Sequence, residues 1–351
     1  MHTKPAAHHP AMRRAISIHS LTLLTTFCLL TFTYRADAAE TEQTPAVPQA
    51  DMVIVVGASG TPEYGEQFSD WAATWREVSE NAAASTITIG ESGFDDSDDR
   101  TLLHETMKTA STQSDQPLWV VLIGHGTFSQ NTAKFNLRGP DVSAADFALW
   151  LQDAQRPVVI INCASSSGPF INQLSGPNRI IVTATKSGTE QNFARFGEFI
   201  AKAIASPDSD LDHDDEVSIQ EAFLRASAET QQFYKTAGRI STEHALIDDN
   251  ADARGTPATM FRGTRPIAKA KDNTPLDGRA ASRQTLAPSN TRLPFTQSEL
   301  AQRDDLEAQL EQLRQQKLTL DAAAYRAKLE PVMIQLAKLY QAAEQRRNDH
   351  Q

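Results

Sequence analysis

The chain has 351 residues, enough for two domains, and a formal net charge of −11. Residues 1–38 hold four basic residues and one acidic residue, so their removal would change this charge to −14. Such an acidic surface repels phosphate backbones and anionic lipid headgroups, which argues against nucleic acid or a membrane surface as the partner.

The first 38 residues have the pattern of a secretory signal. Basic residues at positions 4, 13 and 14 precede the apolar run Leu21–Phe32, and the A-x-A sequence Ala36–Ala38 follows it. The run has 12 residues, fewer than a helix needs to cross a bilayer. We predict a cleaved signal, a flexible leader over 39–50 and an exported protein, periplasmic or extracellular. An uncleaved anchor is the alternative.

The two cysteines are divided between the signal and the mature chain. Cys28 lies in the apolar run, so the mature chain keeps only Cys163. A lone cysteine forms no intramolecular disulfide, and in an exported protein its thiol is exposed to oxidation. This pattern favours a functional thiol over the alternative of a buried, inert one.

Residues 51–255 alternate short apolar runs with stretches of helical periodicity. The expected strands are 52–56, 86–89, 118–123, 157–162 and 178–184, and the expected helices are 66–81, 100–109, 143–153 and 190–205. Ser143 followed by Asp146 predicts a capping box at the third helix. Strands made of continuous Val, Ile and Leu predict an α/β fold, with a mainly parallel sheet flanked by helices on both faces.

The remaining residues divide into two segments. Residues 256–296 are rich in Pro, Thr, Arg, Lys and Ser and are predicted to be a linker. Residues 297–351 carry leucines at helical spacing, with an interruption at Pro331, and are predicted to be a helical hairpin or coiled-coil tail. Such a tail more often serves packing, self-association or a partner than catalysis.

Two strand ends carry the residues of chemical interest. The strand 118–123 runs into the sequence GHG around His125, and the strand 157–162 runs into Cys163. Because functional groups gather at the carboxyl ends of parallel strands, we expect these two residues to lie close together. An imidazole can take the proton of a thiol and make it nucleophilic, and the amides of Gly126 and Cys163 could hold an oxyanion.

This arrangement resembles legumain and its bacterial relatives among the caspase-like cysteine peptidases. The resemblance rests on the two strand ends, 38 residues apart, and extends over 51–260 through RIIVTATKSGTEQNF and TEHALIDDNADARG. It implies a caspase-like fold in which His125 and Cys163 cleave a protein or peptide substrate. Legumain binds its asparagine substrate through an acidic residue and an arginine. Ile161 and Gly65 stand in their places here, so asparagine specificity is not predicted.

Other residues offer weaker candidates. His104 is expected on a helix surface, His244 lies in a loop that resembles the family's, and His350 is near the end of the chain. The loop Gly57–Gly60 suggests a dinucleotide site as an alternative, but Glu63 occupies the position of the third glycine and would repel phosphate.

A second motif, residues 210–221, has the ligand spacing of an EF-hand calcium loop. Its predicted ligands are Asp210, Asp212, Asp214, the carbonyl of Glu216, Ser218 and Glu221. Asp215 takes the position that glycine usually holds, where a positive φ is required, and a helix is expected over 221–235. We predict a structural Ca²⁺ site, and the alternative is an acidic, solvated loop.

The preferred interpretation is an exported cysteine endopeptidase that uses a Cys–His dyad and a backbone oxyanion hole. The alternative is a catalytically inactive calcium-binding scaffold on the same fold, which acts through its helical tail.

Overall fold

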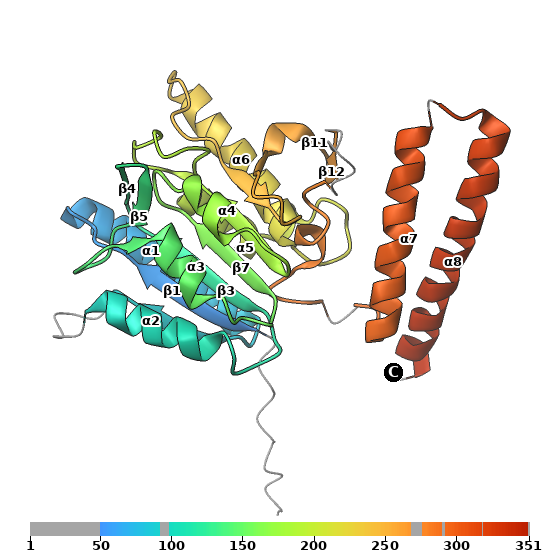
Figure 1. Ribbon diagram of the computed structural model, residues 1–351, viewed down its shortest axis with the longest axis horizontal. Coiled ribbons are helices and arrows are strands. Elements are labelled where there is room, and N and C mark those ends of the chain that lie inside the picture. Colours follow the sequence, from blue (N-terminus) through green and yellow to red (C-terminus); the bar gives the residue numbers. More distant parts are fainter. Residues whose placement is uncertain (1–49, 92–97, 268–275, 290–291, 318, 350–351) are drawn as a thin grey trace, which may run out of the picture. The chain divides into compact units, whose positions relative to one another are not determined.

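The computed structural model describes residues 50–91, 98–267, 276–289, 292–317 and 319–349 (Figure 1). The predicted signal with Cys28, the leader over 39–49 and His350 lie outside the described residues. Among the described residues, none of the helices combines the length and the apolar composition that crossing a membrane requires.

A seven-stranded sheet forms the centre of the fold, in the order β10-β9-β8-β7-β3-β1-β2. The five parallel strands are β1 (Asp51–Val56), β2 (Ser85–Ile89), β3 (Leu118–Ile123), β7 (Val158–Asn162) and β8 (Arg179–Thr183). The antiparallel strands β9 (Leu246–Asp248) and β10 (Thr256–Pro257) extend one edge. The predicted α/β fold with a mainly parallel sheet is therefore confirmed.

Helices cover both faces of this sheet (Figure 1). On one face, α1 (Pro62–Asn81), α5 (Phe196–Ala205) and α6 (Ile219–Thr236) bury their apolar residues against alternate strand residues such as Ile54 and Val121. On the other face, α2 (Asp99–Ala110), α3 (Ala144–Trp150) and α4 (Pro169–Leu174) pack on the intervening strand residues. Because strand side chains alternate, one continuous apolar strand supplies both cores.

Local signals explain where these helices begin. The Ser143 hydroxyl accepts from the Asp146 amide at the start of α3, and the Asp146 carboxylate accepts from the Ser143 amide, so the predicted capping box is confirmed. Thr61 caps α1, and Pro62 occupies the first turn, where its missing amide hydrogen costs nothing.

A small antiparallel sheet was not predicted. It consists of β4 (Gly126–Ser129), β5 (Thr132–Phe135) and β6 (Val142–Ser143) and follows directly after β3. Its strands are short and mostly half-exposed, so they lack the apolar runs that identify the central strands. This sheet brings Phe135 into the core of the α2 face.

The prediction of a linker over 256–296 is wrong for the described part of that segment. β10 joins the central sheet, and β11 (Phe261–Arg262) pairs with β12 (Arg265–Pro266). The same segment contains the short helices η2 (Ala258–Met260) and η3 (Ala281–Arg283). A further short helix, η1 (Pro207–Ser209), lies between α5 and α6. Phe261, Ala281 and Leu286 are buried in the core on the α1 face. The apolar residues are too few and too irregularly spaced to reveal this packing in the sequence.

The C-terminal helices form the predicted helical hairpin. α7 (Gln297–Gln316) and α8 (Ala322–Asp349) pack through their own apolar cluster, which includes Leu306, Leu313, Leu336 and Leu339. The expected interruption at Pro331 is wrong, because α8 continues through this residue.

A carboxyl pair, the buried Asp277 and the half-buried Asp249, holds the segment after residue 276 on the sheet. The Asp249 carboxylate accepts hydrogen bonds from the amides of Gly278 and Ala281, and the Asp249 amide donates to Asp277. Thr256 also donates to Asp277. Burial, together with the neighbouring Asp249 carboxylate, raises the pKa of Asp277 to about 7.

We expect this pair to make stability fall as pH rises. A carboxyl whose folded pKa is raised binds a proton that the unfolded chain has lost, so its contribution is present at acid pH and disappears as pH rises through about 7. Asp277→Asn replaces the acid proton with an amide hydrogen that does not titrate. Thermal unfolding between pH 5 and 8 should show a flatter dependence of Tm on pH for this variant and a higher Tm at pH 8. Identical slopes for variant and wild type would contradict this assignment.

Candidate active site

The pairing of β3 with β7 sets the position of the two predicted catalytic residues. The two strands are parallel, with Leu122 opposite Asn162. The Cys163 amide donates to the Leu122 carbonyl at 2.9 Å and so continues the ladder beyond the end of β7. His125 and Cys163 are thereby brought to the same edge of the sheet, where the carboxyl ends of the strands meet.

Both residues also belong to the same face of the sheet. Ile123, Ile161 and Cys163 lie in the core cluster of the α1 face. The ring of His125, two residues after Ile123, packs on α1, with centroid distances of 4.8 Å to Tyr64 and 5.2 Å to Phe68. Imidazole and thiol therefore emerge from neighbouring strands toward the same helices.

A backbone carbonyl fixes the protonation of the imidazole. His125 Nε2 lies 3.1 Å from the carbonyl oxygen of Ser59, in the loop between β1 and α1. A carbonyl oxygen only accepts hydrogen bonds, so Nε2 carries the proton of the neutral ring. Nδ1 is then the basic nitrogen, and it is the atom that could receive a proton from a thiol.

The loop around His125 and the turn after Cys163 are tied together. The Gly126 amide donates to Ser165 Oγ at 3.2 Å, and the same hydroxyl lies 3.1 Å from the Gly126 carbonyl oxygen. A Cβ atom at Gly126 would come within 2.1 Å of the Ser165 carbonyl oxygen. Glycine is thus required at position 126, because any side chain would force the two loops apart.

The predicted oxyanion hole needs correction. The Cys163 amide is committed to the sheet through the Leu122 carbonyl, so it is not available to an oxyanion in this structure. The Gly126 amide donates to Ser165 Oγ, and it could turn to a ligand only if that hydroxyl rotated away.

The thiol itself is closed off. Cys163 is 1% exposed. A Cβ atom added at Gly197 of α5 would come within 2.8 Å of the Cβ atom of Cys163. The same Cβ atom at Gly197 would come within 2.6 Å of the ring of Trp71 on α1, so α5 packs closely between this ring and Cys163. Burial, reinforced by the nearby Glu243 carboxylate, raises the pKa of the Cys163 thiol well above its usual range.

The segment between β8 and α5 crosses this edge of the sheet. A helix was predicted over 190–205, but α5 begins only at Phe196. The Glu190 carbonyl accepts a hydrogen bond from the Ser166 amide at 2.8 Å, which holds the segment on the turn after Cys163. Phe193 then packs its ring 5.8 Å from that of His125 and 4.6 Å from that of Tyr64.

Sequence reasoning missed several residues of this site. Ser59 and Glu243 stand in loops without periodic patterning, Phe193 falls within the helix predicted over 190–205, and Trp71 belongs to an apolar helix stripe that predicts only core packing. The sole available signal was the concentration of aromatic residues in the expected first helix.

The remaining histidines serve other contacts. His104 on α2 stacks on Trp150, with centroids 4.9 Å apart. His244 Nδ1 lies 2.5 Å from a carboxylate oxygen of Glu190, in an exposed pair beside the strand ends. Both rings are thus engaged with residues other than Cys163 and His125.

The dinucleotide alternative is not supported by the packing of the first loop. A Cβ atom at Gly57 would come within 2.4 Å of the Asn136 carbonyl oxygen and 3.0 Å of the Phe135 ring. β5 therefore occupies the side of the loop that a pyrophosphate would need.

The acidic loop brings three of its six predicted ligands together. One carboxylate oxygen from each of Asp210, Asp212 and Asp214 lies within 4.8 Å of the others. Desolvation, together with the charge of Asp212, raises the pKa of Asp214 to about 6. Asp215 has φ +65°, as its place in the loop predicted.

The other predicted ligands are used differently. Ser218 and Glu221 form the capping box of α6, and the second oxygen of Glu221 accepts from the amides of Leu211 and Asp212. For Glu216 the backbone carbonyl was the predicted ligand, and its side-chain carboxylate accepts from the amide of Ser289. The three aspartates thus fit a hard cation, while Glu221 closes the loop by hydrogen bonds.

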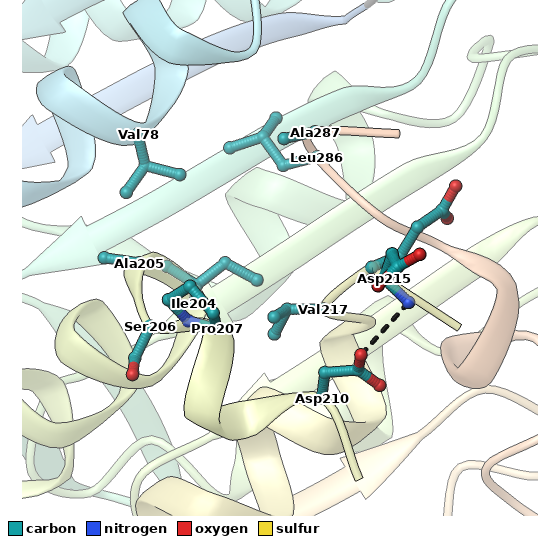
Figure 2. A pocket seen from close by; sticks show the side chains of 11 residues that line it. Val78, Ile204, Ala205, Ser206, Pro207, Asp210, Asp215, Val217, Leu286 and Ala287 are labelled. Atoms are coloured by element: carbon teal, nitrogen blue, oxygen red, sulfur yellow. Dashed lines mark hydrogen bonds between the residues drawn. The ribbon is translucent and has the colours of Figure 1, made fainter. Parts of the chain in front are cut away.

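A pocket of about 280 Å³ adjoins this loop (Figure 2). Val78, Ile204, Val217 and Leu286 give it apolar walls, and Asp210 lies at its border with its carboxylate bonded to the Asp215 amide. Val78 and Ile204 stand near the last residues of α1 and α5, whereas His125 and Cys163 lie at the first turns of these helices. The pocket and the candidate active site therefore lie at opposite ends of the same two helices.

The sequence matches no protein-family model and no curated protein. Among solved structures, the Drosophila initiator caspase Dronc is similar with a TM-score of 0.38 and 13% identity, over 59% of this chain and 81% of that chain. The structure of drICE has a TM-score of 0.38 and 9% identity, over 59% and 90% of the two chains.

Caspase-1 from Spodoptera frugiperda has a TM-score of 0.39 and 8% identity, over 59% of this chain and 88% of that chain. Identities and TM-scores this low leave the activity of the present chain to be judged from its own residues.

Proposed function

We propose that this chain is a cysteine endopeptidase of the caspase and legumain kind, with His125 and Cys163 as its catalytic pair. The observation that carries the proposal is the placement of both residues at the carboxyl ends of the adjacent parallel strands β3 and β7, toward the same face of the sheet. The hydrogen bond from Nε2 to Ser59 supports it, because it leaves Nδ1 unprotonated.

The chemistry proceeds in two halves once a peptide reaches the thiol. Nδ1 of His125 takes the Cys163 proton, and the sulfur attacks the peptide carbonyl to form a tetrahedral oxyanion. The C–N bond breaks as the imidazolium returns its proton to the leaving amine, which leaves a thioester. Water, deprotonated by His125, then attacks the thioester and releases the acid and the thiol. Gly126 would supply one amide to the oxyanion after rotation of Ser165.

Cleavage after asparagine is not part of the proposal. Ile161, which stands where legumain has its acidic residue, is fully buried in the core of the α1 face. It cannot present a polar group to a substrate, so the preferred residue must be set by other side chains around the strand ends.

The inactive scaffold is the second candidate, and the burial of the sulfur favours it. Cys163 is 1% exposed, and its pKa is raised by burial, both of which oppose nucleophilic attack in the closed geometry. In this function the helical hairpin would engage a partner or a second copy, and the thiol would be structural.

A peptide-library cleavage profile separates the two candidates. Wild type should cleave, Cys163→Ala should abolish cleavage, and His125→Ala should lower kcat/KM by at least about 100-fold, the usual contribution of a positioned general base. His104→Ala is the matched control, because this histidine lies on the other face of the sheet, and it should leave kcat/KM unchanged. Cleavage that persists in Cys163→Ala would contradict the proposal.

We also propose that the loop 210–221 binds Ca²⁺ in a structural role. The support is the convergence of the Asp210, Asp212 and Asp214 oxygens, whose mutual repulsion a divalent cation would relieve. Bound Ca²⁺ would fix the turn between α5 and α6, and it takes no part in the proposed hydrolysis.

Calcium should raise the thermal stability of wild type. A ligand at 100 times its Kd stabilises the folded state by about 2.7 kcal/mol, or roughly 5–10 °C in Tm for a domain of this size. Asp212→Asn should abolish the shift between Ca²⁺ and EDTA, whereas Asp208→Asn, an exposed neighbour outside the cluster, should retain it. Equal Tm values for wild type in both conditions would remove the calcium proposal.

The proposed setting is outside the cytoplasm, with proteins or peptides as substrates. Export is supported by the pattern of residues 1–38, and the acidic charge argues against nucleic acid as a partner.

A further inference from the structure

One short segment touches both proposed catalytic residues. This segment, residues 193–197, is called the cover below. At its start, the ring of Phe193 packs on His125, and at its end Gly197 lies against Cys163. A Cβ atom at Gly197 would come within 2.6 Å of Trp71, so the cover fills the space between the thiol and α1.

A single buried carboxylate holds the cover in place. Glu243, on the loop before β9, accepts hydrogen bonds from the Arg195 amide at 2.8 and 2.9 Å and from the Phe196 amide at 2.9 Å. Tyr234 of α6 donates its hydroxyl to the same carboxylate at 2.9 Å. Glu243 is 3% exposed, and it binds the positive end of the ten-residue helix α5.

We infer that residues 193–197 are a movable cover that shuts the Cys163 thiol, and that Glu243 is the positioning residue that holds this cover closed. The inference rests on the proposed function, because it explains how a peptidase can have a sulfur that is 1% exposed. Substrate binding or another signal would release the cover and admit a peptide to the thiol.

Opening of the cover would draw the fully buried Phe196 out of the core of the α1 face, so core packing also holds the cover closed. Phe193 and Arg195 are half-buried, so the outer side of the cover already borders solvent. The later turns of α5 are anchored by the fully buried Ile200 and by Ala203. Gly197 lies between this partly buried start and the anchored remainder, and its lack of a side chain gives the backbone freedom to bend there.

A cation–π contact of Arg195 with two aromatic rings also helps to hold the cover closed. The Arg195 guanidinium lies 5.2 Å from the ring centroid of Phe193 and 5.0 Å from that of Phe233 on α6. This contact is half-exposed and therefore weaker than the buried bonds to Glu243. Glu243 is accordingly the residue whose replacement should open the cover.

The test is the rate at which iodoacetamide alkylates Cys163 in the full chain. Cys28 is separated from the measurement by mass spectrometry of the peptide that contains Cys163. Glu243→Gln removes the negative charge that strengthens the hydrogen bonds from the Arg195 and Phe196 amides, and it should raise the alkylation rate about tenfold to a hundredfold. Tyr234→Phe, which removes one hydrogen bond to Glu243, should give a smaller rise.

Two controls distinguish opening of the cover from general loss of stability. Asp146→Asn removes a capping carboxylate of α3 on the opposite face, and it should leave the alkylation rate unchanged. Low urea concentrations should accelerate alkylation of Glu243→Gln only slightly, because local opening exposes little surface. An unchanged rate in Glu243→Gln, or a rise with the urea dependence of global unfolding, would overturn the inference.

The outcome is separable from that of the cleavage assay. In one outcome, Glu243→Gln is alkylated faster than wild type while neither protein cleaves peptides. That result would refute the peptidase proposal and support the cover. Cleavage by wild type combined with an unchanged alkylation rate in Glu243→Gln would support the peptidase and refute the cover.

Discussion

The parallel pairing of β3 with β7 is the constraint from which the site follows. With Leu122 opposite Asn162 and the Cys163 amide bonded to the Leu122 carbonyl, the residues after both strands are held at one edge and in one register. A slip of one residue would turn the Cys163 side chain to the opposite face, away from the imidazole. The continuous apolar strands that fill two cores make such a slip costly, so the fold itself preserves the geometry.

Around this edge of the sheet, the packing limits the access of a substrate to the Cys163 sulfur and does not favour formation of its thiolate. The ring of His125 is oriented by Ser59 and lies among aromatic side chains, while Cys163 is buried and lies against Gly197. In the closed geometry, burial opposes thiolate formation. Proximity to an imidazole becomes useful only when the sulfur is uncovered. The helix α5 has its first turn at the sulfur and its last at the pocket beside the acidic loop.

The parts of the structure that depend on local patterns could be predicted from the sequence. β3 has the predicted bounds, and the capping box at Ser143 follows from two residues three positions apart. The closure of Cys163 could not be predicted, because it depends on the contact of Gly197, on α5, with the residue that follows β7. The start of α5 was misplaced since the hydrogen bond from Ser166 to the Glu190 carbonyl overrides the helical spacing of 190–195. Glu243 gave no signal, because a carboxylate in a polar loop usually faces solvent.

The crystal structure of a covalent adduct tests the central claim most directly. A peptidyl chloromethyl ketone, with its sequence taken from the cleavage profile, would trap the chain at its nucleophile. We predict a bond from the ketone methylene to the Cys163 sulfur, His125 Nδ1 facing the trapped group, and residues 193–197 displaced. An unmodified sulfur beneath an unmoved segment, with the inhibitor attached elsewhere or absent, would contradict the account.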